Sequence, residues 1–238
     1  MKKNNMRFLR NLIRETKYNF KFFNKNKETK LNYTVNASTN NKLTELMNNY
    51  GSDKGNKKNH HNYSDFYSEL FFNKRKQVKN LLEIGLGTND VNMASNMGSE
   101  GSPLASLRAW RDFFENANIY GADIDKKILK NENKIKTFYV DQTNPDTIKK
   151  MFENIGVEKF DIIIEDGLHE YTANICCFEN SIKYLSDDGI YIIEDVYFKD
   201  KIKFINFFKK ENYNFSIVDI YHEKNIANNC LLLIRKNA

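Results

Sequence analysis

Two short apolar runs, each ending in adjacent carboxylates, constrain the fold of this chain more than any other feature. The first runs from Phe160 to Asp166 and the second from Gly189 to Asp195. Runs of this kind, rich in β-branched residues, are typical of buried parallel strands. Residues 170–185 between them have a helical pattern, so the unit is βαβ and both strands point the same way. The chain is therefore predicted to be an α/β protein.

Four polar residues are expected at the carboxyl edge of this sheet, where open α/β folds place their ligands. They are Asp166, His169, Glu194 and Asp195. Several carboxylates at close range cannot all stay ionised unless a cation lies between them. A hard divalent cation held by oxygen ligands is the simplest solution. Caps of strands and helices would be the alternative role for these acids, and the metal site is favoured over it.

The rest of the chain continues the alternation of strands and helices after a basic N-terminal segment. We predict an N-terminal helical arm and linker over residues 1–41 and one domain over 42–238. Two final strands are expected to pair antiparallel at the edge of the sheet. The predicted strands cover residues 78–84, 119–125, 135–140, 160–165, 189–193, 215–221 and 229–235, and the predicted helices cover 104–114, 144–155, 170–185 and 199–210.

The net charge of +6 belongs to the arm and not to the predicted domain. Residues 1–30 hold ten Lys or Arg and two Glu, which is +8, so the remaining 27 basic and 29 acidic residues give −2. We therefore expect no nucleic-acid partner. The arm could touch an anionic membrane or a partner protein, but a helix packed on the domain or on a second subunit of a homo-oligomer is favoured.

Composition and hydropathy point to the cytoplasm. No apolar run is long enough to span a membrane, and no signal peptide is recognisable. The three cysteines form neither a disulfide framework nor a metal-binding pattern, which is typical of a reducing compartment.

A polar loop and several aromatic residues precede the first core strand. The loop is Gly51–Gly55, and Tyr63 and Tyr67 after it suit a helix that lines a pocket. His60 and His61 are adjacent, and we favour a solvated turn over a pair of ligands because neighbouring residues cannot easily reach one ion.

A glycine loop follows the first core strand. Glu83, Gly85 and Gly87 lie at its start, but Asp90 stands where a third glycine would complete a dinucleotide fingerprint. An acid there would repel a pyrophosphate, which argues against a nicotinamide cofactor. The next strand ends in Asp123, and in such sheets this acid accepts hydrogen bonds from ribose hydroxyls.

These motifs together resemble those of class I S-adenosylmethionine-dependent methyltransferases, a family with a seven-stranded Rossmann-like sheet and a terminal antiparallel strand. The chain looks most like the metal-dependent sugar O-methyltransferases that act on macrolide glycosides, and like their relatives from surface-polysaccharide loci. The resemblance covers about residues 50–195. It rests on Gly51–Gly55, Glu83–Gly87, Ser106–Arg111, Tyr120–Asp125, Asp141–Thr143, Glu165–His169 and Ile193–Asp195.

The resemblance implies a role for each matching residue. Glu83, Gly85 and Gly87 would line the methionine end of S-adenosylmethionine, with Asp123 at the ribose and Asp141 and Gln142 at the adenine. Asp166, Glu194 and Asp195 would bind Mg²⁺ or Mn²⁺, and His169 would be the general base. The implied function is methyl transfer to a hydroxyl of a sugar or sugar nucleotide, in capsule polysaccharide or glycoside biosynthesis.

The chain departs from the family pattern at three positions. The family usually has Asp and Ser where this chain has Glu165 and Leu168, and Asn89 replaces a frequent third glycine. These changes leave the implied ligands intact but affect the pocket near His169.

Two other functions compete with methyl transfer. Tyr197 and Lys201 have the spacing of the catalytic pair of short-chain dehydrogenases, so a nicotinamide-dependent oxidoreductase is one alternative. The other is a non-catalytic, cofactor-binding scaffold.

The chemistry of the acids and the histidine is consistent with methyl transfer even without the resemblance. An alcohol is a poor nucleophile at neutral pH, and a divalent cation lowers its pKa and orients its oxygen. A histidine three residues beyond a ligand is placed to take the proton.

Overall fold

The computed structural model describes residues 29–33, 41–57 and 61–237. Its centre is a sheet of eight strands in the order β1-β7-β8-β6-β5-β2-β3-β4. The strands are β1 Thr29–Tyr33, β2 Asn80–Ile84, β3 Asn118–Asp123, β4 Ile135–Tyr139, β5 Phe160–Glu165, β6 Leu185–Ile193, β7 Asn214–Ile220 and β8 Cys230–Arg235. β8 runs antiparallel to both β6 and β7, and the other pairings are parallel.

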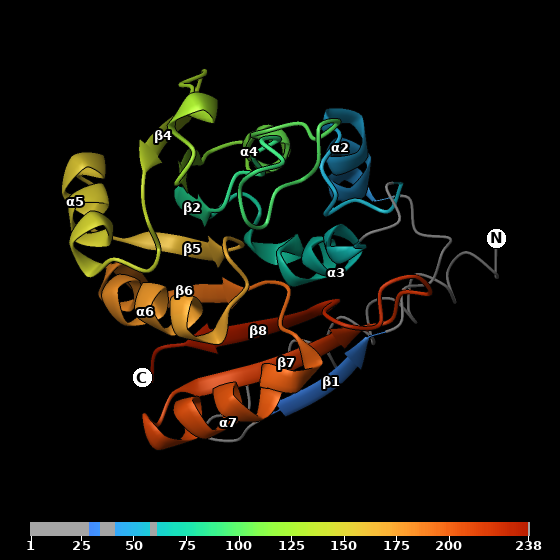
Figure 1. The fold of residues 1–238 in the computed structure, drawn as a ribbon, viewed down its shortest axis with the longest axis vertical. Helices are drawn as coiled ribbons and strands as arrows, with labels where there is room; N and C mark the ends of the chain where they lie inside the picture. Colours follow the sequence, from blue (N-terminus) through green and yellow to red (C-terminus); the bar gives the residue numbers. More distant parts are fainter. Residues whose placement is uncertain (1–28, 34–40, 58–60, 238) are drawn as a thin grey trace.

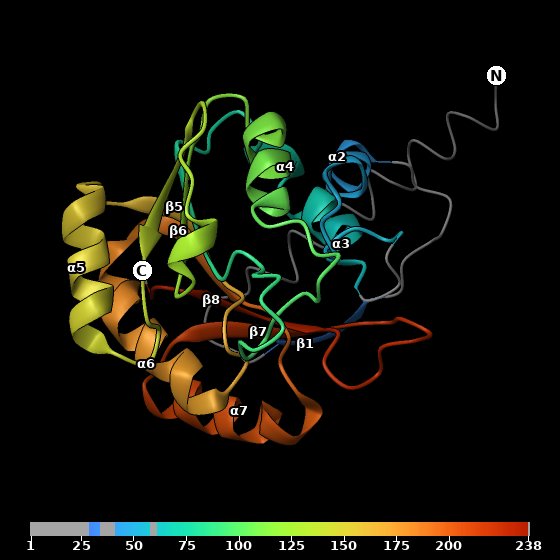
Figure 2. The same cartoon turned by 45° about the horizontal axis from the view of Figure 1, so that its top comes forward.

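Helices cover both faces of the sheet (Figures 1 and 2). One layer contains α2, α3 and α4, and the opposite layer contains α5, α6 and α7. The helices are α2 Lys42–Tyr50, α3 Tyr63–Leu70, α4 Ala105–Phe113, α5 Pro145–Ile155, α6 Tyr171–Ser181 and α7 Lys201–Lys210. Short 3₁₀ turns occupy Phe72–Lys74, Lys126–Ile128, Ile182–Tyr184 and Phe198–Asp200.

The central strands carry continuous apolar runs where both of their faces are buried. In β5, Ile162 and Ile164 pack in the core on the α4 side, whereas Ile163 packs in the core on the α5 and α6 side. β6 divides in the same way between Ile192 and Ile193. Successive side chains of a strand point to opposite faces, so a continuous apolar run supplies both cores.

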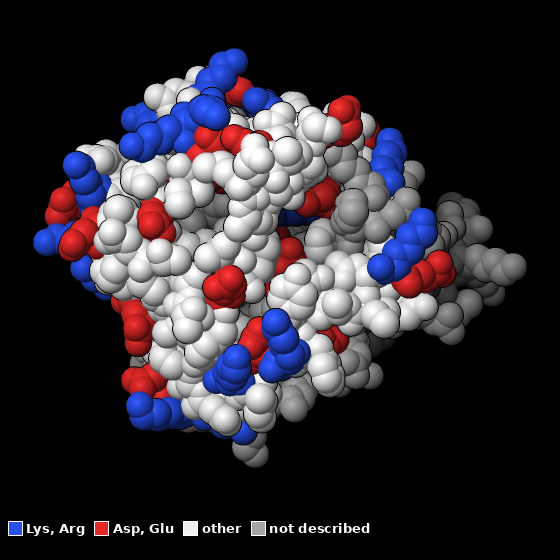
Figure 3. Space-filling view, viewed as in Figure 1, with Lys and Arg blue, Asp and Glu red and all other residues white. Residues whose placement is uncertain are grey.

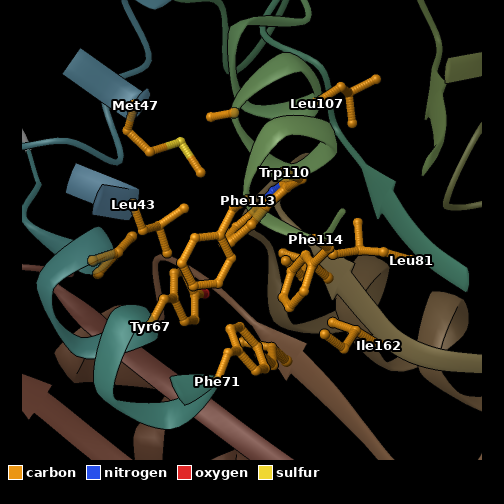
Figure 4. Close-up of a cluster of buried hydrophobic side chains, with 14 of the residues drawn as sticks. Leu43, Met47, Tyr67, Phe71, Leu81, Leu107, Trp110, Phe113, Phe114 and Ile162 are labelled. Carbon is orange, nitrogen blue, oxygen red and sulfur yellow. The ribbon is translucent and has the colours of Figure 1, made fainter. Parts of the chain in front are cut away.

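The α4-side core is dominated by aromatic rings. Figure 4 shows Tyr67 of α3, and Phe71 directly after this helix, beside Trp110 of α4. The Tyr67 and Trp110 ring centroids are 5.5 Å apart, with the rings in an edge-on arrangement. This cluster fixes α3 against α4, and α3 in turn borders the carboxyl edge of the sheet.

All seven predicted strands are present, and the antiparallel pairing of the last two is confirmed. The arm and linker differ from expectation in one place: Thr29–Tyr33 form an eighth strand, parallel to β7, where the sequence predicted the end of a helix and the start of a linker. β1 therefore takes the edge position expected for β7 and β8. The predicted arm helix over residues 1–28 lies outside the described residues.

Candidate active site

A cavity of about 790 Å³ opens at the carboxyl edge of the sheet. The resemblance assigned ten residues to the cofactor, the metal or the base. Nine of them line this cavity, and Glu194 does not. Figure 3 shows a hollow on this face with acidic side chains in it, whereas most of the visible lysines and arginines lie toward the margin. The lining residues include those at the ends of β2, β3, β4, β5 and β6, so the parallel strands bring distant motifs together.

A buried lysine lies among the carboxylates at the floor of the site. Lys54 Nζ contacts Asp166 Oδ2 and Glu194 Oε2, the latter at 2.7 Å, and lies 3.5 Å from Glu83 Oε1. Its side chain is only 3% exposed. The sequence predicted a cation between these acids, and Lys54 supplies part of the positive charge.

One lysine does not neutralise the cluster. Burial alone would lower the pKa of Lys54, but Asp166, Glu194 and Glu83 outweigh it and raise that pKa well above its usual value. Burial raises the pKa of Asp166 to about 7 despite the attraction of Lys54. Burial also raises the pKa of Glu194 well above its usual value. Lys54 supplies one positive charge among the carboxyl groups of Glu83, Asp166 and Glu194, so ionising all three requires a further cation.

Asp166, His169 and Asp195 form a group that could hold a metal ion. One ligand atom from each lies within 4.8 Å of the others. His169 Nε2 is 3.6 Å from Asp195 Oδ2 and 3.9 Å from Asp166 Oδ1. His169 and Asp195 both have left-handed backbones, with φ of 58° and 54°. Such conformations in non-glycine residues cost about 1–3 kcal/mol and cluster at functional sites.

Glu194 lies outside this group of three. Its Oε1 accepts a hydrogen bond from the Tyr67 hydroxyl at 2.7 Å, and its Oε2 accepts one from Lys54. Glu194 is 1% exposed. The structure thus brings two of the three predicted metal ligands together with the predicted base, and directs the third toward Lys54 and α3.

A second layer of side chains fixes Asp195. The Tyr63 hydroxyl donates to Asp195 Oδ1 at 2.5 Å, and His61 Nδ1 lies 3.4 Å from the same oxygen. His61 stacks on Tyr63, with ring centroids 4.7 Å apart. The expectation of a solvated turn was wrong for His61, which is buried in the site; His60 lies outside the described residues.

The glycine loop and Asp123 form one unit. Asp123 Oδ2 accepts from the Leu86 N–H at 2.6 Å, so the end of β3 is tied to the loop after β2. Gly85 has φ of 95°, and a Cβ there would overlap the backbone of Asp166. The glycine therefore allows the loop to approach β5 closely.

Both carboxylate oxygens of Glu83 accept hydrogen bonds from α4. Ser106 Oγ and Trp110 Nε1 each donate to one of its carboxylate oxygens at 2.6 Å. Because Glu83 is 1% exposed, its main visible effect is to anchor α4 against β2.

Asp141 and Gln142 line the cavity after β4. Asp141 Oδ1 accepts from the Thr143 N–H at 2.9 Å, which shapes this turn. Gln142 is bonded to Glu165 and to the Leu168 backbone.

Sequence reasoning missed the role of Lys54, although it identified the Gly51–Gly55 loop that carries it. The local sequence pattern does not show that a lysine will be buried. The available signal was the excess of carboxylates, which requires a positive charge nearby. The alternative dehydrogenase pair does not come together in the cavity. Tyr197 lines it, but Lys201 does not and its Nζ contacts Asp219.

Replacing Lys54 with methionine should lower the free energy of unfolding by about 3 kcal/mol, because removing one partner of a buried ion pair leaves the others uncompensated. Added Mg²⁺ should restore part of that loss by supplying positive charge. Chemical denaturation with and without Mg²⁺ measures both effects. Lys149→Met, which removes an exposed pair with Glu153, is the control and should change stability little. Equal losses in the two variants would contradict the role given to Lys54.

No protein-family model matches the chain. It is 30% identical over 147 residues to 8-demethyl-8-alpha-L-rhamnosyl tetracenomycin-C 2'-O-methyltransferase of Streptomyces olivaceus, covering 62% of this chain and 35% of that protein. It is 31% identical over 137 residues to demethylmacrocin O-methyltransferase of Streptomyces fradiae, covering 58% and 32%. The chain thus spans about a third of the length of these curated relatives.

A structure of MycE methyltransferase from the mycinamycin biosynthetic pathway, in complex with Mg and SAH, matches with a TM-score of 0.54 and 28% identity. That match covers 66% of this chain and 37% of MycE. A second crystal form gives a TM-score of 0.61 at 24% identity and supports the fold. Within the described residues, no helix is long and apolar enough to cross a membrane. The chain has the class I Rossmann-like methyltransferase fold and resembles the sugar O-methyltransferases of macrolide and polyketide pathways.

Proposed function

We propose that this protein is a Mg²⁺- and S-adenosylmethionine-dependent O-methyltransferase that acts on a hydroxyl of a sugar. The observation that carries the proposal is that the Asp166–His169–Asp195 group and the glycine loop line the same cavity. A methyl donor and a hydroxyl held near the acidic group would thus share one cavity. The likeness to sugar O-methyltransferases supports this assignment.

The acceptor is proposed to be a glycoside or a sugar nucleotide, in glycoside or surface-polysaccharide biosynthesis in the cytoplasm. The names of two relatives support the glycoside class, since one describes methyl transfer to a rhamnosyl tetracenomycin-C and the other to an olivosyl-oleandolide. A sugar with two neighbouring hydroxyls would suit a divalent cation, which binds vicinal oxygens.

The residues fit a hard divalent cation. Asp166 and Asp195 would hold it through carboxylate oxygens, with Glu194 as a third ligand if its carboxylate turns from Lys54. Oxygen donors favour Mg²⁺ or Mn²⁺. When bound, the cation would lower the pKa of a hydroxyl oxygen and fix its position.

The chain's own groups would hold and deprotonate the acceptor. His169 Nε2 faces the carboxylates from the loop after β5, so it could take the hydroxyl proton of an acceptor held there. Tyr63 keeps Asp195 in place by its hydrogen bond. Lys54 lowers the repulsion between Asp166 and Glu194.

The cofactor is proposed to lie over Gly85 and Gly87, with its methionine end near Glu83, its ribose at Asp123 and its adenine near Asp141. Replacing Asp123 with alanine should weaken S-adenosylhomocysteine binding at least about tenfold. The change removes charge-assisted hydrogen bonds worth roughly 1.5–3 kcal/mol and also frees the Leu86 N–H that shapes the loop.

Isothermal titration calorimetry measures the affinity of this variant. Asp146→Ala is the control, because Asp146 is an exposed residue of the first turn of α5 and should leave binding unchanged. Wild-type affinity in the Asp123 variant would show that the ribose lies elsewhere.

The proposed function is tested by two measurements on the full chain. Calorimetry should show binding of S-adenosylhomocysteine and none of NADH. Methyl transfer from labelled S-adenosylmethionine should then appear with some member of a panel of glycosides and sugar nucleotides, in the presence of Mg²⁺. Binding of NADH in place of S-adenosylhomocysteine would replace the proposal with an oxidoreductase, and cofactor binding without any turnover would favour a scaffold.

A further inference from the structure

Three buried polar side chains lie beneath the loop that carries His169. Glu165 is fully buried, and Gln142 and Asn174 are 8% and 2% exposed. Gln142 Nε2 donates to Glu165 Oε1 at 2.8 Å, and Asn174 Nδ2 donates to Glu165 Oε2. The two carboxylate oxygens therefore receive one amide donor each.

This arrangement fixes the orientation of the Gln142 amide. A carboxylate accepts hydrogen bonds and cannot donate them, so the NH₂ group of Gln142 must face Glu165. The carbonyl oxygen of Gln142 then points to the loop and accepts from the Leu168 N–H at 2.7 Å. Gly167 permits this approach, since a Cβ there would overlap Gln142 Oε1.

The bond to Leu168 matters because the next residue in the chain is His169. That histidine has a left-handed backbone, which surrounding contacts must hold in place. Its Nδ1 is buried and has no hydrogen-bond partner among the described residues. Among the described residues, the position of the ring thus depends on Nε2, which faces Asp166 and Asp195, and on the backbone that Gln142 anchors one residue earlier.

We propose that Gln142, oriented by Glu165, is a positioning residue that holds the His169 loop, and that this is its main role in place of contact with adenine. The proposal rests on the proposed function only in taking His169 as the base. The hydrogen bonds themselves are independent of that assignment.

The first variant is Gln142→Met, which keeps the side-chain length and removes both hydrogen bonds. Amide hydrogen exchange measured by NMR should show a protected Leu168 N–H in the wild type and faster exchange in the variant. The turnover number should fall about tenfold to a hundredfold, because small misplacements of reacting groups have effects of that size. Affinity for S-adenosylhomocysteine should stay essentially unchanged. In a His169→Ala background the same change should cause no further loss, since Gln142 acts through His169.

A reciprocal exchange provides a sharper test. In Gln142→Glu alone, two buried carboxyl groups face each other and can share one proton. At high pH, where that proton is lost, their repulsion should lower activity at least as far as in Gln142→Met. The double variant Gln142→Glu with Glu165→Gln can restore the bonds between residues 142 and 165, from Asn174 and from the Leu168 N–H without a shared proton. Its new amide can donate to the new carboxylate and accept from Asn174, while that carboxylate still accepts from the Leu168 N–H. Protection of that N–H and the turnover number should both recover toward the wild type.

The results separate this proposal from the proposed function. Loss and recovery of Leu168 protection test the hydrogen-bond arrangement even if no acceptor is found. Unchanged protection in Gln142→Met would overturn the proposal. So would a fall in cofactor affinity at constant turnover number, an additive loss with His169→Ala, or a double variant no better at high pH than Gln142→Glu.

Discussion

Replacing Asp166 with asparagine should lower methyl transfer by roughly a thousandfold or more, and EDTA should have the same effect on the wild type. A bound cation contributes several kcal/mol to stabilising developing charge, and each 1.36 kcal/mol corresponds to a factor of ten. Asp166 is the ligand candidate that faces both His169 and the Lys54 cluster. The neutral amide would be a poorer ligand, so metal and activity should be lost together.

Cofactor binding distinguishes this effect from unfolding. The proposed cofactor contacts lie on β2, β3 and the turn after β4, so S-adenosylhomocysteine affinity should be nearly unchanged in Asp166→Asn and in EDTA. Asp161→Asn is a matched control, because Asp166 directly follows β5 whereas Asp161 lies near its opposite end and accepts from the Lys79 and Asn80 backbone. Full activity of metal-free protein in EDTA would reduce the acidic cluster to a structural role.

The strands could be predicted from the sequence because their signal is local. A strand buried on both faces is the structure that the run Ile162, Ile163 and Ile164 indicates. Once the strands were parallel, the carboxylates after β5 and β6 had to share one edge. The order of β1 in the sheet could not be foreseen, since Thr29–Tyr33 carries no apolar run.

The partners of the site residues were harder to predict because they come from distant segments. Lys54 precedes Asp166 by 112 residues and Glu194 by 140, and only the three-dimensional packing of the Gly51–Gly55 loop brings them together. The same holds for Tyr63, which bonds Asp195 across 132 residues. A sequence pattern indicated the excess of negative charge at the site, and the fold determined which group compensates part of it.

Two of the three departures from the family pattern meet in one network. Glu165 orients Gln142, and Gln142 binds the backbone of Leu168. These positions affect how the His169 loop is held, whereas Asp166 and Asp195 themselves match the family pattern. A family pattern alone could identify the substitutions but not this connection, which depends on the direction of each hydrogen bond.

Replacing His169 with alanine should lower the turnover number by about 10²–10⁴-fold, the usual contribution of a general base. Metal binding should persist, because Asp166 and Asp195 remain, and cofactor affinity should be unchanged. The residual rate should rise with pH as hydroxide replaces the missing base, and added imidazole should restore part of it by occupying the space that the ring leaves. Rates measured across pH, with and without imidazole, check these points.

The matched control for this variant is His222→Ala, since His222 lies outside the cavity lining and should not affect the rate. Both variants lose one imidazole. A difference between their rates therefore shows that the effect depends on where the His169 ring lies and not on the loss of an imidazole as such. A His169→Ala enzyme with wild-type rate at neutral pH would mean that the acceptor loses its proton to another group or to water. Loss of metal together with the rate would instead make His169 a ligand, as its 3.6 and 3.9 Å distances to the two carboxylates would also allow.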